Sequence, residues 1–160
     1  MHSLFPGMKA ALNLHPMFVH FPIVLWLAAL LFEFLAVWRS KDEFHRTGMW
    51  LLYLGTLAAV VTALTGLYAQ ESVPNGPAQA VVELHEDVML VTFSFAVGLC
   101  MFAFFARKNF TAGFRKLMLL GLIILAGLLS YGTDRGAQLV YQYGAGVNWP
   151  AAQQQVAAPK

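Results

Sequence analysis

The sequence has few charged residues and a single cysteine. Charged side chains make up 11% of its 160 residues, whereas an ordinary soluble domain has about 25%. Such a chain cannot cover its own surface with polar groups, so we expect lipid to solvate much of it. The net charge of +2 argues against a polyanion partner such as nucleic acid. Cys100 alone cannot form an intramolecular disulfide, and the sequence has neither a Cys-His zinc pattern nor a Cys-x-x-Cys-His haem-attachment motif.

Long apolar runs dominate the chain instead. Four of them approach the length of about 20 residues that a helix needs to cross a bilayer. They cover residues 21–38, 49–69, 88–106 and 117–132. The fourth run is short, so we expect it to recruit flanking residues. No A-x-A cleavage site follows the first run, which favours a retained span over a signal peptide.

Lysine and arginine are distributed unevenly between the connections. The first and third connections are basic, and the second, residues 70–87, carries only acidic charges. The basic residues are Arg39, Lys41, Arg46, Arg107, Lys108, Arg115 and Lys116. The positive-inside rule places both basic connections in the cytoplasm and both termini outside. We therefore expect a multi-pass protein of the bacterial inner (cytoplasmic) membrane, with its termini in the periplasm.

Short connections favour antiparallel neighbours, so the predicted fold is an all-α, integral membrane four-helix up-down bundle. Residues 1–150 would form this single domain, and residues 151–160 a flexible tail. Residues 136–149 do not form a span. Leu139, Val140 and Tyr143 would form the apolar side of a short C-terminal interfacial helix that ends at Gly144.

A stripe of small residues follows one face of the second run. The stripe consists of Gly55, Ala59, Thr62 and Gly66, spaced by four, three and four positions. Small residues let helices approach closely in lipid, so we interpret the stripe as a packing face. A flat cofactor could use the same close approach.

Histidines gather at the predicted outer face. His15 and His20 precede the first apolar run, and His85 precedes the third. Imidazoles from two helices at one depth are what bis-histidine ligation of a b-type haem requires. On one continuous helix His15 and His20 would differ by about 140° and about 7.5 Å, so we expect only one to bind the iron. Pro22 cannot bond back to Phe18 and must bend or start the helix, which leaves His20 free to turn. This favours His20 and His85 as ligands, with His15 in a supporting position.

Two alternatives use the same residues. The segment "VELHED" (residues 82–87) with His15 or His20 could form a mixed imidazole–carboxylate site for zinc or another divalent metal, using His85 and Glu86. However, acids ahead of a helix also complement its dipole without any metal. In the second alternative the histidines only form hydrogen bonds at the interface, and the protein is a cofactor-free structural subunit of a respiratory complex.

Other polar residues complete the candidate set. Glu33 is a carboxylate inside an apolar run, so it should face the bundle or carry a proton. We expect it to meet a hydroxyl such as that of Thr56 or Thr62. His45 lies among charged residues and is expected to be solvated. Arg135, after the fourth run, could contact a haem propionate.

Four motifs resemble the domain-of-unknown-function family 2231, a group of small bacterial four-helix membrane proteins. They are "LHPMFVHFPI", "TGLYA", "ELHED" and "LVYQYGAGV", and the likeness runs over about residues 14–147. Relatives occur beside Rieske or c-type cytochrome domains, which implies membrane electron transfer. By motif, His15 and His20 match the "HP…VHFP" pair and His85 matches the third-span histidine. Relatives often carry a histidine where this chain has Tyr143, so the resemblance does not extend to a second cofactor there.

Together these observations predict a b-type cytochrome-like electron-transfer subunit that holds one haem b near the periplasmic face. His20 and His85 would bind the iron, with His15 and Arg135 nearby. We expect electrons to pass between a periplasmic redox protein and a larger membrane respiratory complex or a quinone. The role fits a non-catalytic electron-transfer subunit better than an enzyme.

Overall fold

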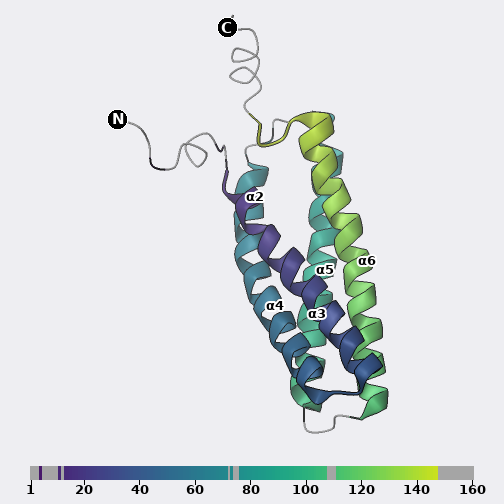
Figure 1. The fold of residues 1–160 in the computed structure, drawn as a ribbon. Coiled ribbons are helices and arrows are strands. Elements are labelled where there is room, and N and C mark those ends of the chain that lie inside the picture. Colours follow the sequence, from purple (N-terminus) through teal and green to yellow (C-terminus); the bar gives the residue numbers. More distant parts are fainter. Residues whose placement is uncertain are drawn as a thin grey trace, which may run out of the picture.

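The structure is a computed structural model that describes Leu4, Ala11 and residues 13–71, 73, 76–107 and 111–147. These residues form α2 (His15–Phe18), α3 (His20–Arg39), α4 (Asp42–Gln70), α5 (Gln79–Ala106) and α6 (Ala112–Tyr143). The α2 and α3 helices together make one span, so four helical segments are long and apolar enough to cross a membrane. The four segments run alongside one another (Figure 1), which confirms the predicted all-α four-helix bundle.

The two ends of the bundle differ in charge. We call the end with the α3–α4 and α5–α6 connections the basic end, because arginines and lysines gather there. The opposite end, where α2 begins, α6 ends and α4 connects to α5, is the acidic end (Figure 1). The two ends of the described helical chain therefore lie on the same side, as an even number of spans requires.

Local sequence explains where the helices begin and end. Asp42 and Glu43 lie in the first turn of α4, where carboxylates complement the helix dipole. The hydroxyl of Thr111 caps α6 by accepting a hydrogen bond from the backbone N–H of Phe114. Gly144 ends α6 in the left-handed conformation at φ 69°, which glycine adopts at low cost.

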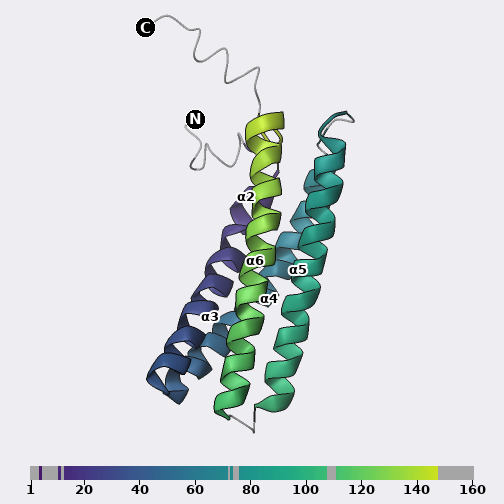
Figure 2. The same cartoon turned by 90° about the vertical axis from the view of Figure 1, so that its right-hand side faces the viewer.

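The core contains small residues and leucines packed between two helix pairs. The α3 helix packs mainly on α4, and α5 packs mainly on α6 (Figure 2). A Cβ atom at Gly55 would lie 2.7 Å from the Trp26 ring, so this glycine lets α3 and α4 approach closely. Large apolar side chains such as Leu27, Leu31 and Leu64 instead cover the outside, as expected of a surface in contact with lipid.

The first span bends where the sequence places Pro22. Because Pro22 has no N–H, the carbonyl of Phe18 cannot receive the usual helical hydrogen bond. The hydroxyl of Thr62 on α4 lies 3.1 Å from this carbonyl and 3.1 Å from the Ala58 carbonyl of its own helix, so its one proton is shared between the two acceptors. The α2 and α3 helices meet at Val19, between these two residues. The bend is therefore stabilised from the neighbouring helix, and the helical segment starts at His15 rather than at Pro22.

The C-terminal interfacial helix predicted from the sequence does not form as a separate element. The α6 helix continues without interruption from Ala112 to Tyr143 and ends, as predicted, at Gly144. No proline interrupts this stretch, and the glycines within it remain helical. Val82 and Leu139 pack together between α5 and α6 at the acidic end. Residues 151–160, the predicted tail, lie outside the described residues.

Candidate functional site

His15 is held by the backbone of α4 at the acidic end. Its Nδ1 lies 3.1 Å from the carbonyl oxygen of Thr62. A carbonyl can only accept, so Nδ1 carries the proton and the other ring nitrogen, Nε2, has a lone pair. The ring rests against Gly66, where a Cβ atom would lie 3.0 Å from the His15 Cε1. A larger residue at position 66 would displace the imidazole.

His85 is held in the same way by α6. Its Nδ1 donates to the carbonyl oxygen of Gly132 at 2.8 Å. Its ring rests against Gly136, where a Cβ atom would lie 3.1 Å from the His85 Cε1. Here too Nδ1–H is fixed, and Nε2 is left with its lone pair.

The two arrangements match position by position. In each helix pair, one carbonyl anchors the imidazole, and the glycine four residues later supports the ring. The pairs are Thr62 with Gly66 and Gly132 with Gly136. Both imidazoles lie at the acidic end of the bundle. We call this set the paired-histidine site.

His20 is placed differently. It is the first residue of α3, and its side chain is exposed. The structure therefore brings His15 rather than His20 into a fixed orientation near His85. The α2 helix continues ahead of Pro22, and this places the His15 ring against the backbone of α4. The side chain of His20, five residues further along the chain, points in another direction.

Arg135 lies on α6 between Gly132 and Gly136 of the paired-histidine site. Its guanidinium donates to the side-chain oxygen of Gln138 at 2.9 Å and forms a close ion pair with Asp134. It also lies over the ring of Tyr131, 5.3 Å from its centroid. A contact between Arg135 and a propionate stays a prediction, and it would require exchange of these local partners.

The chemistry of this donor set follows from its ligand count. Two neutral imidazoles can supply two axial ligands to a metal that is already held in a plane. A zinc site needs three or four protein ligands. Within the described part of the chain, no group of three or more histidine, cysteine or acidic side chains lies together in a way that could hold a metal ion.

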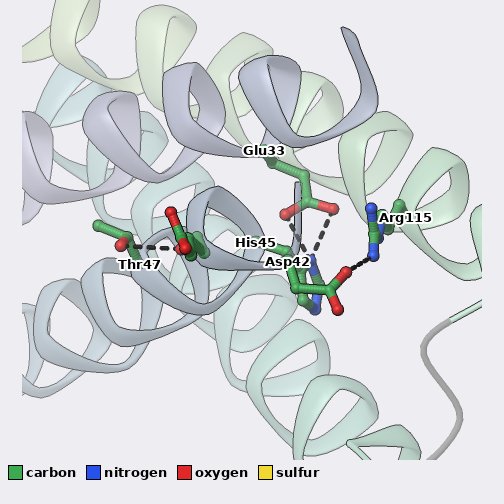
Figure 3. A network of polar contacts seen from close by, with 6 residues as sticks. Glu33, Asp42, His45, Thr47 and Arg115 are labelled. Carbon is green, nitrogen blue, oxygen red and sulfur yellow. Dashed lines mark hydrogen bonds and ion pairs between the residues drawn. The ribbon is translucent and has the colours of Figure 1, made fainter. Parts of the chain in front are cut away.

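A second polar site lies at the basic end and was not predicted. Glu33 and His45 are both buried, with side-chain exposures of 0% and 1%. His45 Nδ1 lies 2.9 Å and 2.7 Å from the two carboxylate oxygens of Glu33 (Figure 3). The expectation that His45 is solvated is wrong, and so is the expectation that Glu33 meets a hydroxyl.

The sequence does contain a signal for this buried pair. A left-handed residue, Ser40 at φ 54°, ends α3, and α4 begins two residues later. Such a tight hairpin brings a residue near the end of one helix to the level of a residue near the start of the next. Glu33 and His45 lie on either side of this hairpin. Gly48 lets α3 and α4 approach closely beside the pair, since a Cβ atom there would lie 3.2 Å from the backbone carbonyl oxygen of Ala29.

Comparison with known proteins gives one match. Residues 11–149 match a family model whose description is "Predicted membrane protein (DUF2231)". The search of curated proteins gave no match. The search of solved structures also gave none.

Proposed function

The chain belongs to the DUF2231 family of predicted membrane proteins, and we propose that it holds one haem b at the paired-histidine site. His15 and His85 are the axial ligands in this proposal, each through Nε2. When bound, such a haem supplies a one-electron redox centre whose two axial positions are both filled. The protein is then a membrane electron-transfer subunit rather than an enzyme.

One observation carries this proposal: the two histidines are prepared in the same way on separate helix pairs. Metal-binding imidazoles commonly donate their second nitrogen to a carbonyl or carboxylate, which fixes tautomer and ring orientation. Both rings here donate Nδ1–H to a carbonyl, at 3.1 Å and 2.8 Å. Because each ring in its neutral form uses Nδ1–H for this hydrogen bond, both Nε2 atoms stay available as ligands.

The divalent-metal alternative is less well supported. It requires Glu86 or another carboxylate to join the imidazoles, because two protein ligands are too few for a zinc site. A porphyrin brings four nitrogen ligands of its own, so two imidazoles suffice. The donor set therefore suits haem better than a free ion.

The position of the site indicates which partners could exchange electrons with the haem. His15 and His85 both lie near the acidic end, and the positive-inside rule places that end on the periplasmic side of the inner membrane. We propose that a periplasmic redox protein exchanges electrons with the haem there. A larger respiratory complex or a quinone would be the partner within the membrane.

The test is an absorption spectrum of the full-length protein, purified in detergent from cells supplied with a haem precursor. We expect a reduced-minus-oxidised difference spectrum of a low-spin b-type haem and about one haem per chain by pyridine haemochromogen. His15→Ala and His85→Ala should each abolish this spectrum. Elemental analysis of the same samples measures iron and zinc.

The matched control is His20→Ala, which removes an exposed imidazole five residues from His15 and should keep the haem. Loss of haem in His20→Ala with retention in His15→Ala would reverse the ligand assignment. Absence of haem from the unaltered protein would overturn the proposal, and stoichiometric zinc would favour the metal-binding alternative.

A further inference from the structure

The contacts of the paired-histidine site recur in the chain at a constant spacing. Each residue on the His15 side has a counterpart on the His85 side that lies 70 positions further along the sequence. The three pairs are His15 with His85, Thr62 with Gly132, and Gly66 with Gly136. A hydrogen bond to a backbone carbonyl and a ring that rests on a glycine therefore both recur with one shift.

The same shift relates two contacts at the opposite end of the bundle. Phe32 of α3 packs against Phe44 of α4 with 6.1 Å between ring centroids. Their counterparts 70 positions later, Phe102 of α5 and Phe114 of α6, pack against each other at 5.1 Å. The repeated spacing thus holds from the acidic end to the basic end.

The pattern of burial repeats with this shift as well. The α4 helix begins at Asp42 and α6 begins at Ala112, again 70 positions apart. Buried positions of the first two long helices correspond to buried positions of the last two, although most residue types differ. These pairs are Pro22 with Thr92, Trp26 with Ala96, Glu33 with Ala103, Gly48 with Met118, Leu52 with Leu122, Gly55 with Leu125, Ala59 with Leu129 and Thr62 with Gly132. The two hairpins, α3–α4 and α5–α6, therefore share one register.

The helices are also arranged as a two-fold axis requires. Both α3 and α5 run from the acidic end to the basic end, and both α4 and α6 run back (Figure 1). Within each hairpin the two helices pack together, and between the hairpins α3 packs on α6 while α5 packs on α4. Exchanging the hairpins converts each of these contacts into another of them, which is the property of an axis along the bundle.

From these observations we propose that the chain contains two structural copies of one helix hairpin, related by a pseudo-two-fold axis, and that the paired-histidine site takes one planar ligand across this axis. His15 and His85 meet opposite faces of the ligand in equivalent surroundings. The inference rests on the proposed function, in which the ligand is haem b. It adds that the two halves share one ligand and that the site does not distinguish its two faces.

This equivalence has a measurable consequence, because haem b is not itself two-fold symmetric. Its vinyl and methyl groups differ on the two sides of the line that passes between its propionates. A half-turn about this line exchanges the faces and leaves the propionates at the same end. We expect the two orientations to be populated within about tenfold of each other, a difference in binding free energy below about 1.4 kcal/mol.

The first test is proton NMR of the oxidised full-length protein, equilibrated in detergent with its haem. Two orientations give two sets of shifted haem methyl signals, whereas one orientation gives a single set. Gly66→Ala and Gly136→Ala crowd opposite faces of the site, since each Cβ atom would lie about 3 Å from one imidazole. They should therefore change the ratio of the two sets in opposite directions. If either variant does not retain haem, the number of sets in the unaltered protein decides.

Spin-label distances test the repeat without any haem. Leu31 of α3 and Ile124 of α6 form one pair of labelling sites, and their counterparts Met101 of α5 and Leu54 of α4 form the other. All four side chains are exposed. With Cys100 replaced by alanine, double electron–electron resonance of the full-length protein in nanodiscs should give the same distance distribution for both pairs.

The matched control labels Met101 with Leu57 instead of Leu54. Leu57 is exposed on the same helix but lies three residues out of the repeated register, so its distance distribution should differ. Clearly different distances for the two equivalent pairs would overturn the two-fold relation, whatever the protein binds.

The two measurements also separate this inference from the proposed function. A haem held in a single orientation, or a ratio that shifts in the same direction in both glycine variants, overturns the shared two-fold site and leaves the haem assignment intact. Absence of haem from the unaltered protein overturns the proposed function and the ligand part of this inference. The spin-label distances still decide whether the two hairpins are equivalent.

Discussion

The two histidine-containing sites of this bundle differ in the group that faces the imidazole. At the acidic end, His15 and His85 each donate to an uncharged backbone carbonyl. At the basic end, His45 faces a carboxylate, that of Glu33. A carbonyl fixes a neutral ring and leaves the other nitrogen available as a ligand, whereas the Glu33 carboxyl group holds the His45 ring within a buried pair of side chains.

The hydrogen-bond partner of each histidine therefore indicates its role more directly than the depth of the histidine in the bundle does. All three imidazoles lie near an end of a span, so depth alone does not distinguish them. Substitutions at the two ends should accordingly separate two properties. Changes at the basic end should alter stability with little effect on haem, whereas changes beside His15 and His85 should alter haem binding as well as stability.

The largest effect on stability is expected when the buried pair is broken. His45→Ala removes the buried hydrogen-bond partner of Glu33, and removal of one partner of such a buried pair costs about 3–5 kcal/mol. We expect this loss in the free energy of unfolding measured in detergent micelles. Glu33→Gln, which retains a hydrogen-bond acceptor, should lose less. An equal loss in both variants would show that the charge does not matter.

A smaller effect is expected from Gly66→Ala and Gly136→Ala at the acidic end. Each added Cβ would lie about 3 Å from an imidazole Cε1, and overpacking costs about 1–3 kcal/mol. The main readout is haem content and the shape of the difference spectrum, since the rings must tilt. Gly127→Ala is the control, because its Cβ would meet nothing within 4 Å. A normal spectrum in both glycine variants would contradict the assigned ligand geometry.

A smaller decrease in the free energy of unfolding, of about 1 kcal/mol, is expected from Thr62→Val. This variant keeps the carbonyl that anchors His15 but removes the hydroxyl that donates to Phe18. Unfolding in detergent measures the loss. Thr133→Val, whose hydroxyl bonds within its own helix to Ser130, should have a smaller effect. If Thr62→Val and Thr133→Val lower the free energy of unfolding equally, the Thr62 hydroxyl of α4 does not stabilise the bend at Pro22.

The smallest effect is expected from Asp42→Asn. Its carboxylate is 59% exposed, so the pair with Arg115 is screened by water and should contribute less than about 1 kcal/mol. The difference should shrink further when salt is added to the detergent solution. A loss as large as that of His45→Ala would mean that Asp42 and Arg115 act as one network with the buried pair.

The architecture could be predicted from the sequence because lipid exposure imposes long apolar runs. The first span, the helix end at Gly144 and the packing role of Gly55 all follow from local rules. The length of α6 was missed because its last turns are amphipathic and look like a surface helix when read alone. Only packing of Leu139 against Val82 shows that these turns continue the bundle.

The site residues were harder to predict because they depend on contacts between helices. The orientation of His15 depends on the backbone carbonyl of Thr62, which lies 47 residues away on another helix. The burial of His45 depends on the tight hairpin at Ser40, whose charged surroundings in the sequence suggested solvent instead. In both cases the sequence indicated the chemistry of the side chain but not its orientation.

The anchors of His15 and His85 have a consequence for how this site responds to mutation. Both acceptors are main-chain atoms, so no change of side chain at position 62 can delete the carbonyl that anchors His15. At position 132 the constraint is stricter, because any Cβ there would collide with the Met89 side chain of α5. Substitution at position 62 should therefore leave the orientation of His15 nearly unchanged as long as the helices keep their register, whereas substitution at Gly132 should displace the helix that carries His85.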